Sequence, residues 1–504
     1  MNWRLLLLLG GALGLRLAIA PLPSFWVDEA FTIHLLGQDF GGMLDRLAET
    51  ESTPPLYYAL AWLWSQVSGV GELGLRSLSA LAGTATVGLA WILGRWVAGP
   101  RAALAAGALV AVNPFMLWFS TEARAYALAT ALATGALVLL VRLLARDADA
   151  GEAERDAPPE RERLDGRHFA AWAALAAGAL LTHYATVFVI GAQAVILLHR
   201  RSTRAAWGAV AAVAAMGAAL APLAVAQRDN GFAQTFDEVG TPLTERVAQI
   251  PKQFAIGYDA PLESIAGGVA IVVLALGVVL VLLSERELRR RALVPLTVGV
   301  AGVAAPIALA TVVAALPFSL TGLDVVSSRY LLPALPALLV AAAAGFTAGT
   351  RSPLGPALVA GVAAGWLAVS VAVAADPRLQ TRADWQGVEE ALGPAPAGGR
   401  AIVTSPSNGA LVLTGAYRLA ARYEPTGPVA EVVLAATGEG QAAPPDALST
   451  SPGLTDAGFR LVEQRRERGY VLQRWRARKP VPIDPALVAA AGLDVSDSSV
   501  LWQP

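Results

Sequence analysis

Two adjacent carboxylates, Asp28 and Glu29, stand in the segment FWVDEAFTIHLL, directly after the first apolar run of the chain. A charge beside a membrane span is costly unless it pairs or meets a substrate, so ionisable residues there are candidates for function. Asp28 has the chemistry of a general base that accepts a hydroxyl proton, while Glu29 could orient it, bind a cation or face water. The alternative for this pair is a solvated acidic turn.

Cationic and aromatic residues recur beside later apolar runs, in the motifs STEARAY, THY and SSRYLLPALP. Arginine carries planar, permanently charged donors that fit phosphate oxygens. Arg124 and Arg329 are therefore candidates for binding a lipid-linked phosphate. The other candidates for substrate or lipid-phosphate binding are His183, Tyr330, Glu122 and Tyr57.

Each of these candidates has a structural alternative. Arg124 could pair locally with Glu122 at a helix end, and Arg329 could be an anchor at the membrane interface. His183 could simply hydrogen-bond at a helix corner. Tyr57 stands in an aromatic run that favours an interfacial belt over a sugar platform.

Composition sets the class of protein. Of 504 residues, 55% are hydrophobic and 15% are charged, whereas about 25% charged residues is usual for a soluble domain. Apolar runs of about 20 residues, long enough to cross a bilayer, recur as far as residue 375. The net charge of −1 and the lack of a basic patch exclude a nucleic-acid partner. Cysteine is absent, which excludes disulfides and thiolate metal sites.

Arginine-rich connections indicate the topology. Residues 199–204 and 284–292 should lie in the cytoplasm by the positive-inside rule, which places 120–126 outside. Residues 3–20 are interpreted as a retained first span with a cytoplasmic N-terminus. Counting every apolar run gives twelve spans and contradicts the outer position of 120–126, so we expect a short or broken helix within residues 54–97.

The expected fold is an α-helical polytopic membrane protein of about 11–13 spans, with a small extracytoplasmic α/β domain at its C-terminus. The predicted boundaries are 1–375 for the transmembrane domain, 376–478 for the α/β domain and 479–504 for a tail without a core. The predicted strands are 401–405, 429–436, 459–465 and 470–475.

The order and spacing of the motifs resemble the dolichyl-phosphate-mannose-protein mannosyltransferase superfamily (glycosyltransferase family 39-like). Its GT-C fold also includes the aminoarabinose transferases of lipid A. The resemblance covers roughly residues 1–390. It rests on the outer Asp-Glu pair and on PPLYY (54–58), RSLS (76–79), NPFMLWFSTEARAYAL (113–128), THY (182–184), SSRYLLPALP (327–336) and RADWQGVEEAL (382–392).

The resemblance implies an inverting glycosyltransferase that uses a polyprenyl-phosphate-linked sugar at the outer face of the cell membrane. Asp28 matches the family's proposed catalytic residue, a general base, and Glu29 matches its neighbour. Arg124 and Arg329 fall where the family has outer-face arginines. No His precedes Asp28, which disfavours protein O-mannosylation and favours an envelope glycan or lipid over a protein as acceptor.

The sugar stays open between mannose, arabinose and aminoarabinose. No cofactor is predicted, because no second acidic cluster supports a divalent cation. The main functional alternative is a transporter or flippase of lipid-linked saccharides, but such folds show internal repeats or paired broken helices. A binding module on a membrane anchor is the third hypothesis, and it would not need so many spans.

Overall fold

The chain folds into two compact units in the computed structural model. The first unit comprises Met1–Ala20, Phe40–Gly69 and Leu73–Val371, and the second comprises Pro21–Asp39, Val70–Glu72 and Ala372–Pro504. The described residues are 2–148, 159–229, 241–314, 326–347, 353–376, 383–423, 427–438, 448, 451–467, 469–482 and 498–504.

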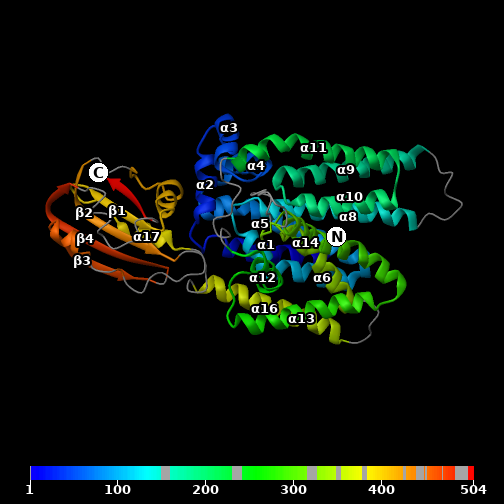
Figure 1. The fold of residues 1–504 in the computed structure, drawn as a ribbon. Helices are drawn as coiled ribbons and strands as arrows, with labels where there is room; N and C mark the ends of the chain where they lie inside the picture. The colour runs from blue at the N-terminus through cyan, green and yellow to red at the C-terminus, as the bar shows by residue number, and fades with distance from the viewer. Residues whose placement is uncertain are drawn as a thin grey trace. The chain divides into compact units, whose positions relative to one another are not determined.

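The first unit is a bundle of helices, in which α8, α9, α10 and α11 run side by side (Figure 1). Its elements are α1 (Trp3–Ile19), α3 (Phe40–Thr50), α4 (Leu56–Ser68), α5 (Glu72–Ala98), α6 (Pro100–Val112), α7 (Pro114–Ser120), α8 (Tyr126–Ala148), α9 (Pro159–Thr182), α10 (Thr186–Arg200), α11 (Arg204–Asp229), α12 (Leu243–Ile256), α13 (Glu263–Leu282), α14 (Arg286–Ala314), the 3-10 turn η3 (Leu332–Ala334), α15 (Leu335–Thr347) and α16 (Leu354–Ala375).

Six helices of the described chain, α5, α8, α11, α13, α14 and α16, are long and apolar enough to cross a membrane. The pair α6 and α7, bent by 60°, makes a seventh if it counts as one span. Shorter apolar helices are α10 and the stretch Leu332–Thr347. α4 has only 13 residues, which agrees with the short helix expected within residues 54–97. The chain is a multi-pass membrane protein.

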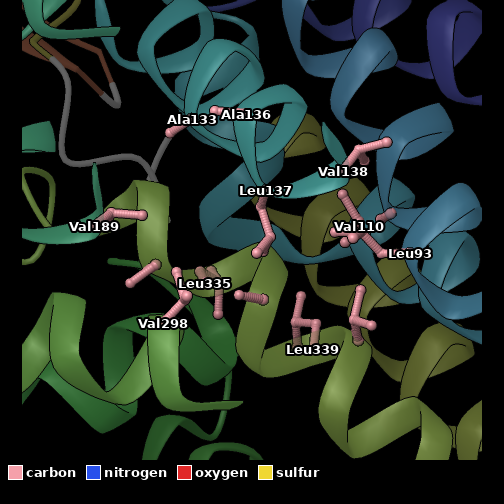
Figure 2. Packing of buried hydrophobic residues seen from close by; sticks show 14 of the residues in the cluster. Leu93, Val110, Ala133, Ala136, Leu137, Val138, Val189, Val298, Leu335 and Leu339 are labelled. Carbon is pink, nitrogen blue, oxygen red and sulfur yellow. The ribbon is translucent and has the colours of Figure 1, made fainter. Parts of the chain in front are cut away.

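Helix α15 forms the centre of the bundle, because it is apolar on every side. Leu335 and Leu339 lie among buried side chains of α8 and α14, including Leu137 and Val298 (Figure 2). A Cβ at Gly345 would lie 1.8 Å from the carbonyl oxygen of Gly277 in α13. The two helices therefore cross backbone to backbone, as small residues allow in membranes.

Arg16, which interrupts the first apolar run, supports the break between α6 and α7. Pro114 has no N–H, so the carbonyl of Val110 loses its helical donor. Arg16 donates from Nη2 to that oxygen (3.5 Å) and from Nη1 to the carbonyl oxygen of Ala111 (3.1 Å). Asn113 caps α7 by accepting from the Met116 amide at 2.9 Å. A buried arginine thus satisfies carbonyls that the break exposes.

The second unit contains a five-stranded sheet in the order β3-β4-β2-β1-β5. β1 and β2 are parallel, and the other neighbours are antiparallel. Its elements are α2 (Val27–Leu36), α17 (Trp385–Leu392), β1 (Arg400–Ser405), α18 (Gly409–Leu411), the π-turn η5 (Val412–Ala416), β2 (Pro428–Thr437), α19 (Pro452–Asp456), β3 (Phe459–Arg466), β4 (Tyr470–Pro482) and β5 (Ser499–Gln503).

The sheet contains all four predicted strands, and it differs from the expected domain boundaries in two places. β4 continues to Pro482 and β5 pairs with β1, so part of the predicted coreless tail belongs to the sheet; residues 483–497 lie outside the described chain. Segment Pro21–Asp39, assigned by the sequence to the membrane domain, clusters with the second unit. The helix that carries the acidic pair is therefore part of that unit.

Candidate functional site

Three aromatic rings from distant segments meet in the bundle. Tyr126 begins α8, His183 lies in the corner between α9 and α10, and Tyr330 precedes η3. The centroid of the His183 ring lies 5.4 Å from that of Tyr126 and 5.0 Å from that of Tyr330, and the two tyrosine rings are stacked at 6.4 Å. With Arg124 and Arg329 these residues form what we call the bundle cluster.

His183 presents a buried hydrogen-bond donor within this cluster. Its Nδ1 accepts from the Ala185 amide at 3.2 Å, so in the neutral ring Nε2 carries the proton. Nε2 is buried and has no hydrogen-bond partner in the described part of the chain. Burial lowers the pKa of His183 to about 3, and the charges of Arg124 and Arg329 add to this effect. The ring is therefore a neutral donor at physiological pH.

Arg124 is held by a carboxylate that the sequence reasoning missed. Its Nη1 lies 3.0 Å from both carboxylate oxygens of Glu51, and both side chains are buried. Glu51 stands two residues before the Thr-Pro-Pro segment that enters α4, and this proximity was the only available signal. A buried ion pair of this kind fixes the direction of the guanidinium. Arg124 thus has an ion-pair partner 73 residues earlier in the chain, in addition to its neighbour Glu122 in the sequence.

The remaining candidates of the bundle lie near the same segments. Arg329 is 7% exposed, and its guanidinium carbon lies 5.5 Å from the centroid of the Tyr330 ring. Glu122 is buried in the turn between α7 and α8, where its carbonyl accepts from the Arg124 amide at 2.9 Å. Tyr57 is buried in α4, edge-on to Tyr58 with ring centroids 5.6 Å apart.

The two ends of α8 differ in chemistry. Tyr126 at its start belongs to the bundle cluster. Near its other end, the carbonyl of Leu143 accepts from Arg201 at 2.8 Å. Arg201 lies in the arginine-rich connection between α10 and α11. The cluster and this basic connection thus occupy opposite ends of the same helix.

The acidic pair opens α2 in the second unit. Carboxylates in the first turn of a helix interact favourably with its macrodipole. Glu29 is fully buried, and its Oε2 accepts from the Trp26 amide at 3.5 Å. Asp28 is only partly buried. Because adjacent residues on a helix point in different directions, the two carboxylates have distinct surroundings.

No group of three His, Asp or Glu side chains able to hold a metal ion occurs among the residues that the structure describes.

The candidate residues divide between the two units. Arg124, His183, Arg329, Tyr330, Glu122 and Tyr57 lie in the first, and Asp28 and Glu29 in the second.

Comparison with known proteins identifies the fold. The family model "Dolichyl-phosphate-mannose-protein mannosyltransferase" matches residues 52–151, and no curated protein sequence matches the chain. ArnT from Cupriavidus metallidurans is similar in its apo state (TM-score 0.53, 13% identity) and bound to undecaprenyl phosphate (TM-score 0.54, 12% identity). Each comparison covers 93% of this chain and 97% of ArnT. The chain therefore shares its fold with ArnT, as its motifs predict, and residues 52–151 are similar to the mannosyltransferase family.

Proposed function

We propose that this protein is an inverting glycosyltransferase that moves a hexosyl or pentosyl group from a polyprenyl-phosphate donor to an acceptor hydroxyl. The observation that carries the proposal is the bundle cluster, where the buried Nε2–H of His183 lies beside two arginines. A buried donor without a partner destabilises the fold by about 1–3 kcal/mol. Such a group is retained where a ligand supplies the acceptor.

The chemistry of the cluster suits a lipid-linked phosphate. Arg124 and Arg329 carry permanent positive charge, and the neutral His183 adds a directional donor. Phosphate oxygens accept from all of these groups. The ArnT structure with bound undecaprenyl phosphate shows that a protein of this fold binds such a lipid.

Asp28 is the proposed general base. Glu29 is fully buried, and its Oε2 accepts from the Trp26 amide, whereas Asp28 is only partly buried. The acceptor oxygen attacks the anomeric carbon as the bond from that carbon to the phosphate oxygen breaks, and the hydroxyl proton passes to Asp28. The phosphate leaves as an anion, so a second carboxyl group is not required as an acid, unlike in inverting glycosidases.

The proposed site faces the outside of the cell membrane, with a cytoplasmic N-terminus and an extracytoplasmic C-terminal unit. Support comes from the separation of the bundle cluster from the basic connection at the other end of α8. Because the chain has no cysteine, single cysteines at His34 and Arg200 would report the topology. An impermeant maleimide should label the first and not the second in intact cells.

The direct test is sugar transfer by purified, reconstituted protein with a panel of radiolabelled polyprenyl-phosphate sugars. We expect turnover of one donor, and a fall of about 10²–10⁴-fold in Asp28→Asn, the range usual for a general base. Asp45→Asn, which alters an exposed carboxylate of α3, is the matched control and should keep full activity. Equal turnover in both variants would remove Asp28 as the base. Lipid-linked saccharide crossing the bilayer without transfer would favour a flippase instead.

A further inference from the structure

The segment just before α2 is built into the C-terminal part of the second unit. The Ser24 hydroxyl donates to Oδ1 of Asp384 at 2.8 Å and accepts from the Gln386 amide at 3.2 Å. The same Asp384 oxygen accepts from the Gly387 amide at 2.9 Å and so caps α17. Ser24 therefore joins the first turn of α17, about 360 residues further along the chain.

A second hydrogen bond lies one residue closer to the acidic pair. The Phe25 amide donates to the hydroxyl oxygen of Tyr417 at 3.0 Å. The two rings are in tilted contact, with centroids 6.2 Å apart, and Phe25 is buried. We call the hydrogen bonds Ser24–Asp384 and Phe25–Tyr417 the latch.

The backbone that presents Tyr417 is unusual. Tyr417 ends the π-turn η5, with its amide bonded to the carbonyl of Val412 at 3.2 Å. The next residue, Arg418, has φ +53°, a conformation that costs free energy for a residue with a Cβ. π-turns are rare in proteins, and those that do occur are often found at functional sites. Helix α2 itself packs against η5 and α18, so this irregular segment supports the acidic helix directly.

The other end of α17 is fixed to the sheet. Arg474 of β4 donates to the carbonyl of Ala391 at 2.7 Å, and Arg400 of β1 donates to that of Pro394 at 2.9 Å. Cationic donors at the C-terminus of a helix satisfy its free carbonyls and favour its dipole. A continuous set of polar contacts thus runs from the sheet through α17 to Ser24, four residues before Asp28.

We infer that Ser24, Asp384 and Tyr417 are positioning residues that hold α2. Through them the C-terminal part of the second unit, Ala372–Pro504, sets the orientation of the proposed base. This inference rests on the proposed function of Asp28. It assigns to the C-terminal part of the second unit a role in the transfer step itself, in addition to any contact with the acceptor. Loss of the latch should lower kcat and leave the KM for the donor unchanged, because the donor phosphate is assigned to the bundle cluster.

The test uses the full chain with the double variant Ser24→Ala/Tyr417→Phe, which removes both latch bonds and leaves the Asp384 cap of α17 in place. We expect amide hydrogen exchange in residues 27–36 to rise on the order of tenfold. Exchange in β1, β2 and β4 should stay unchanged. The kcat for sugar transfer should fall about tenfold at constant KM.

Tyr423→Phe is the matched control, since its hydroxyl contacts Thr414 in the same region and lies outside the latch. It should change neither readout. A conservative pair adds rescue. Asp384→Asn keeps an acceptor and a good cap and should resemble the wild type. Asp384→Ala removes the Ser24 bond and the cap of α17 but keeps the Phe25–Tyr417 bond, so it should raise exchange in residues 27–36 less than the double variant does.

Unchanged exchange in residues 27–36 of the double variant would overturn the latch. Faster exchange with an unchanged kcat would overturn the positioning role. If the wild type transfers no sugar, the proposed function fails, while the exchange measurement still decides whether the latch holds α2.

Discussion

Two groups of charged side chains, one in each unit, differ in how completely the hydrogen bonds of their buried members are satisfied. In the second unit, Glu431 accepts from Arg400 at 2.6 Å and from Arg474 and Arg476 at 2.8 Å each. Arg400 and Arg474 also donate to carbonyls at the end of α17, and Nε of Arg474 donates to Glu463 at 2.9 Å. We call Glu431 and these three arginines the sheet cluster. Its groups lie on one face of the sheet and bind one another and the backbone.

The hydrogen bonds of the bundle cluster are less complete. Arg124 has Glu51 as its partner, but Nε2 of His183 has none among the residues described. Buried polar groups are nearly always hydrogen-bonded, so each exception needs a reason. The sheet cluster, whose hydrogen bonds are satisfied, therefore stabilises the fold. The bundle cluster, which has an unsatisfied donor, is the better candidate for binding a ligand.

Glu431→Gln should have the largest effect, and on stability. It leaves three arginines around a neutral group, and breaking a buried ion pair on one side costs about 3–5 kcal/mol. Hydrogen exchange in β1, β2 and β4 of the full chain measures the loss. Glu467→Gln, which breaks an exposed pair with Arg465, is the control and should leave exchange in these strands unchanged. Equal effects would mean that the sheet cluster does not stabilise the fold.

Arg329→Gln should act on the ligand rather than on the fold. Loss of one charge-assisted contact to phosphate is worth about 1.5–3 kcal/mol, so affinity for polyprenyl phosphate should fall roughly 10–100-fold. Titration of the detergent-solubilised protein with the lipid measures this. Arg142→Gln, at an exposed position of α8, is the control. Unaltered affinity together with reduced thermal stability would make Arg329 a structural residue.

His183 permits a paired substitution. Asn places an acceptor near the position of Nδ1 and loses the Nε2 donor, whereas Gln can place an amide N–H near the position of Nε2. Asn should therefore weaken lipid binding about tenfold, and Gln should weaken it less. The same titration distinguishes them. Equal affinities for the two variants would show that the Nε2 donor does not contact the phosphate.

The two clusters should also respond to pH in different windows. His183 has a folded pKa of about 3 and an unfolded value of 6.5, so the unfolded chain binds more protons between these values. The free energy of unfolding of the bundle therefore falls by up to about 1.4 kcal/mol per pH unit as the pH falls below 6.5.

For Glu431, burial raises the pKa, but the hydrogen bond from Arg476 and the charges of Arg400 and Arg474 outweigh it and hold the pKa below 4.5. Its stabilisation is therefore present above pH 4.5 and is lost as pH falls through the folded pKa. Hydrogen exchange between pH 7 and 4 should show the bundle weakening before the sheet. Simultaneous loss in both units would contradict this assignment.

Much of the fold was predictable from local patterns. Apolar runs and charge bias identified the membrane bundle, because a bilayer demands long apolar helices. Short runs rich in apolar residues identified four of the five strands. β5 was missed, since its segment SVLWQ is short and follows a proline-bearing stretch. Glu51 was missed as the partner of Arg124, because a pairing over 73 residues leaves no periodic signal.

The sequence by itself determined the chemistry that is available: an acidic pair after the first apolar run, arginines beside later apolar runs and a histidine at a helix corner. Composition and motif order are properties of the chain alone. Only the tertiary structure decided that Nε2 of His183 has no partner among the described residues and that the segment before α2 is hydrogen-bonded to Asp384 and Tyr417. Both features depend on contacts between residues far apart in the chain. Burial excludes water there, so each hydrogen bond that is made or missing changes the free energy more than it would at the surface.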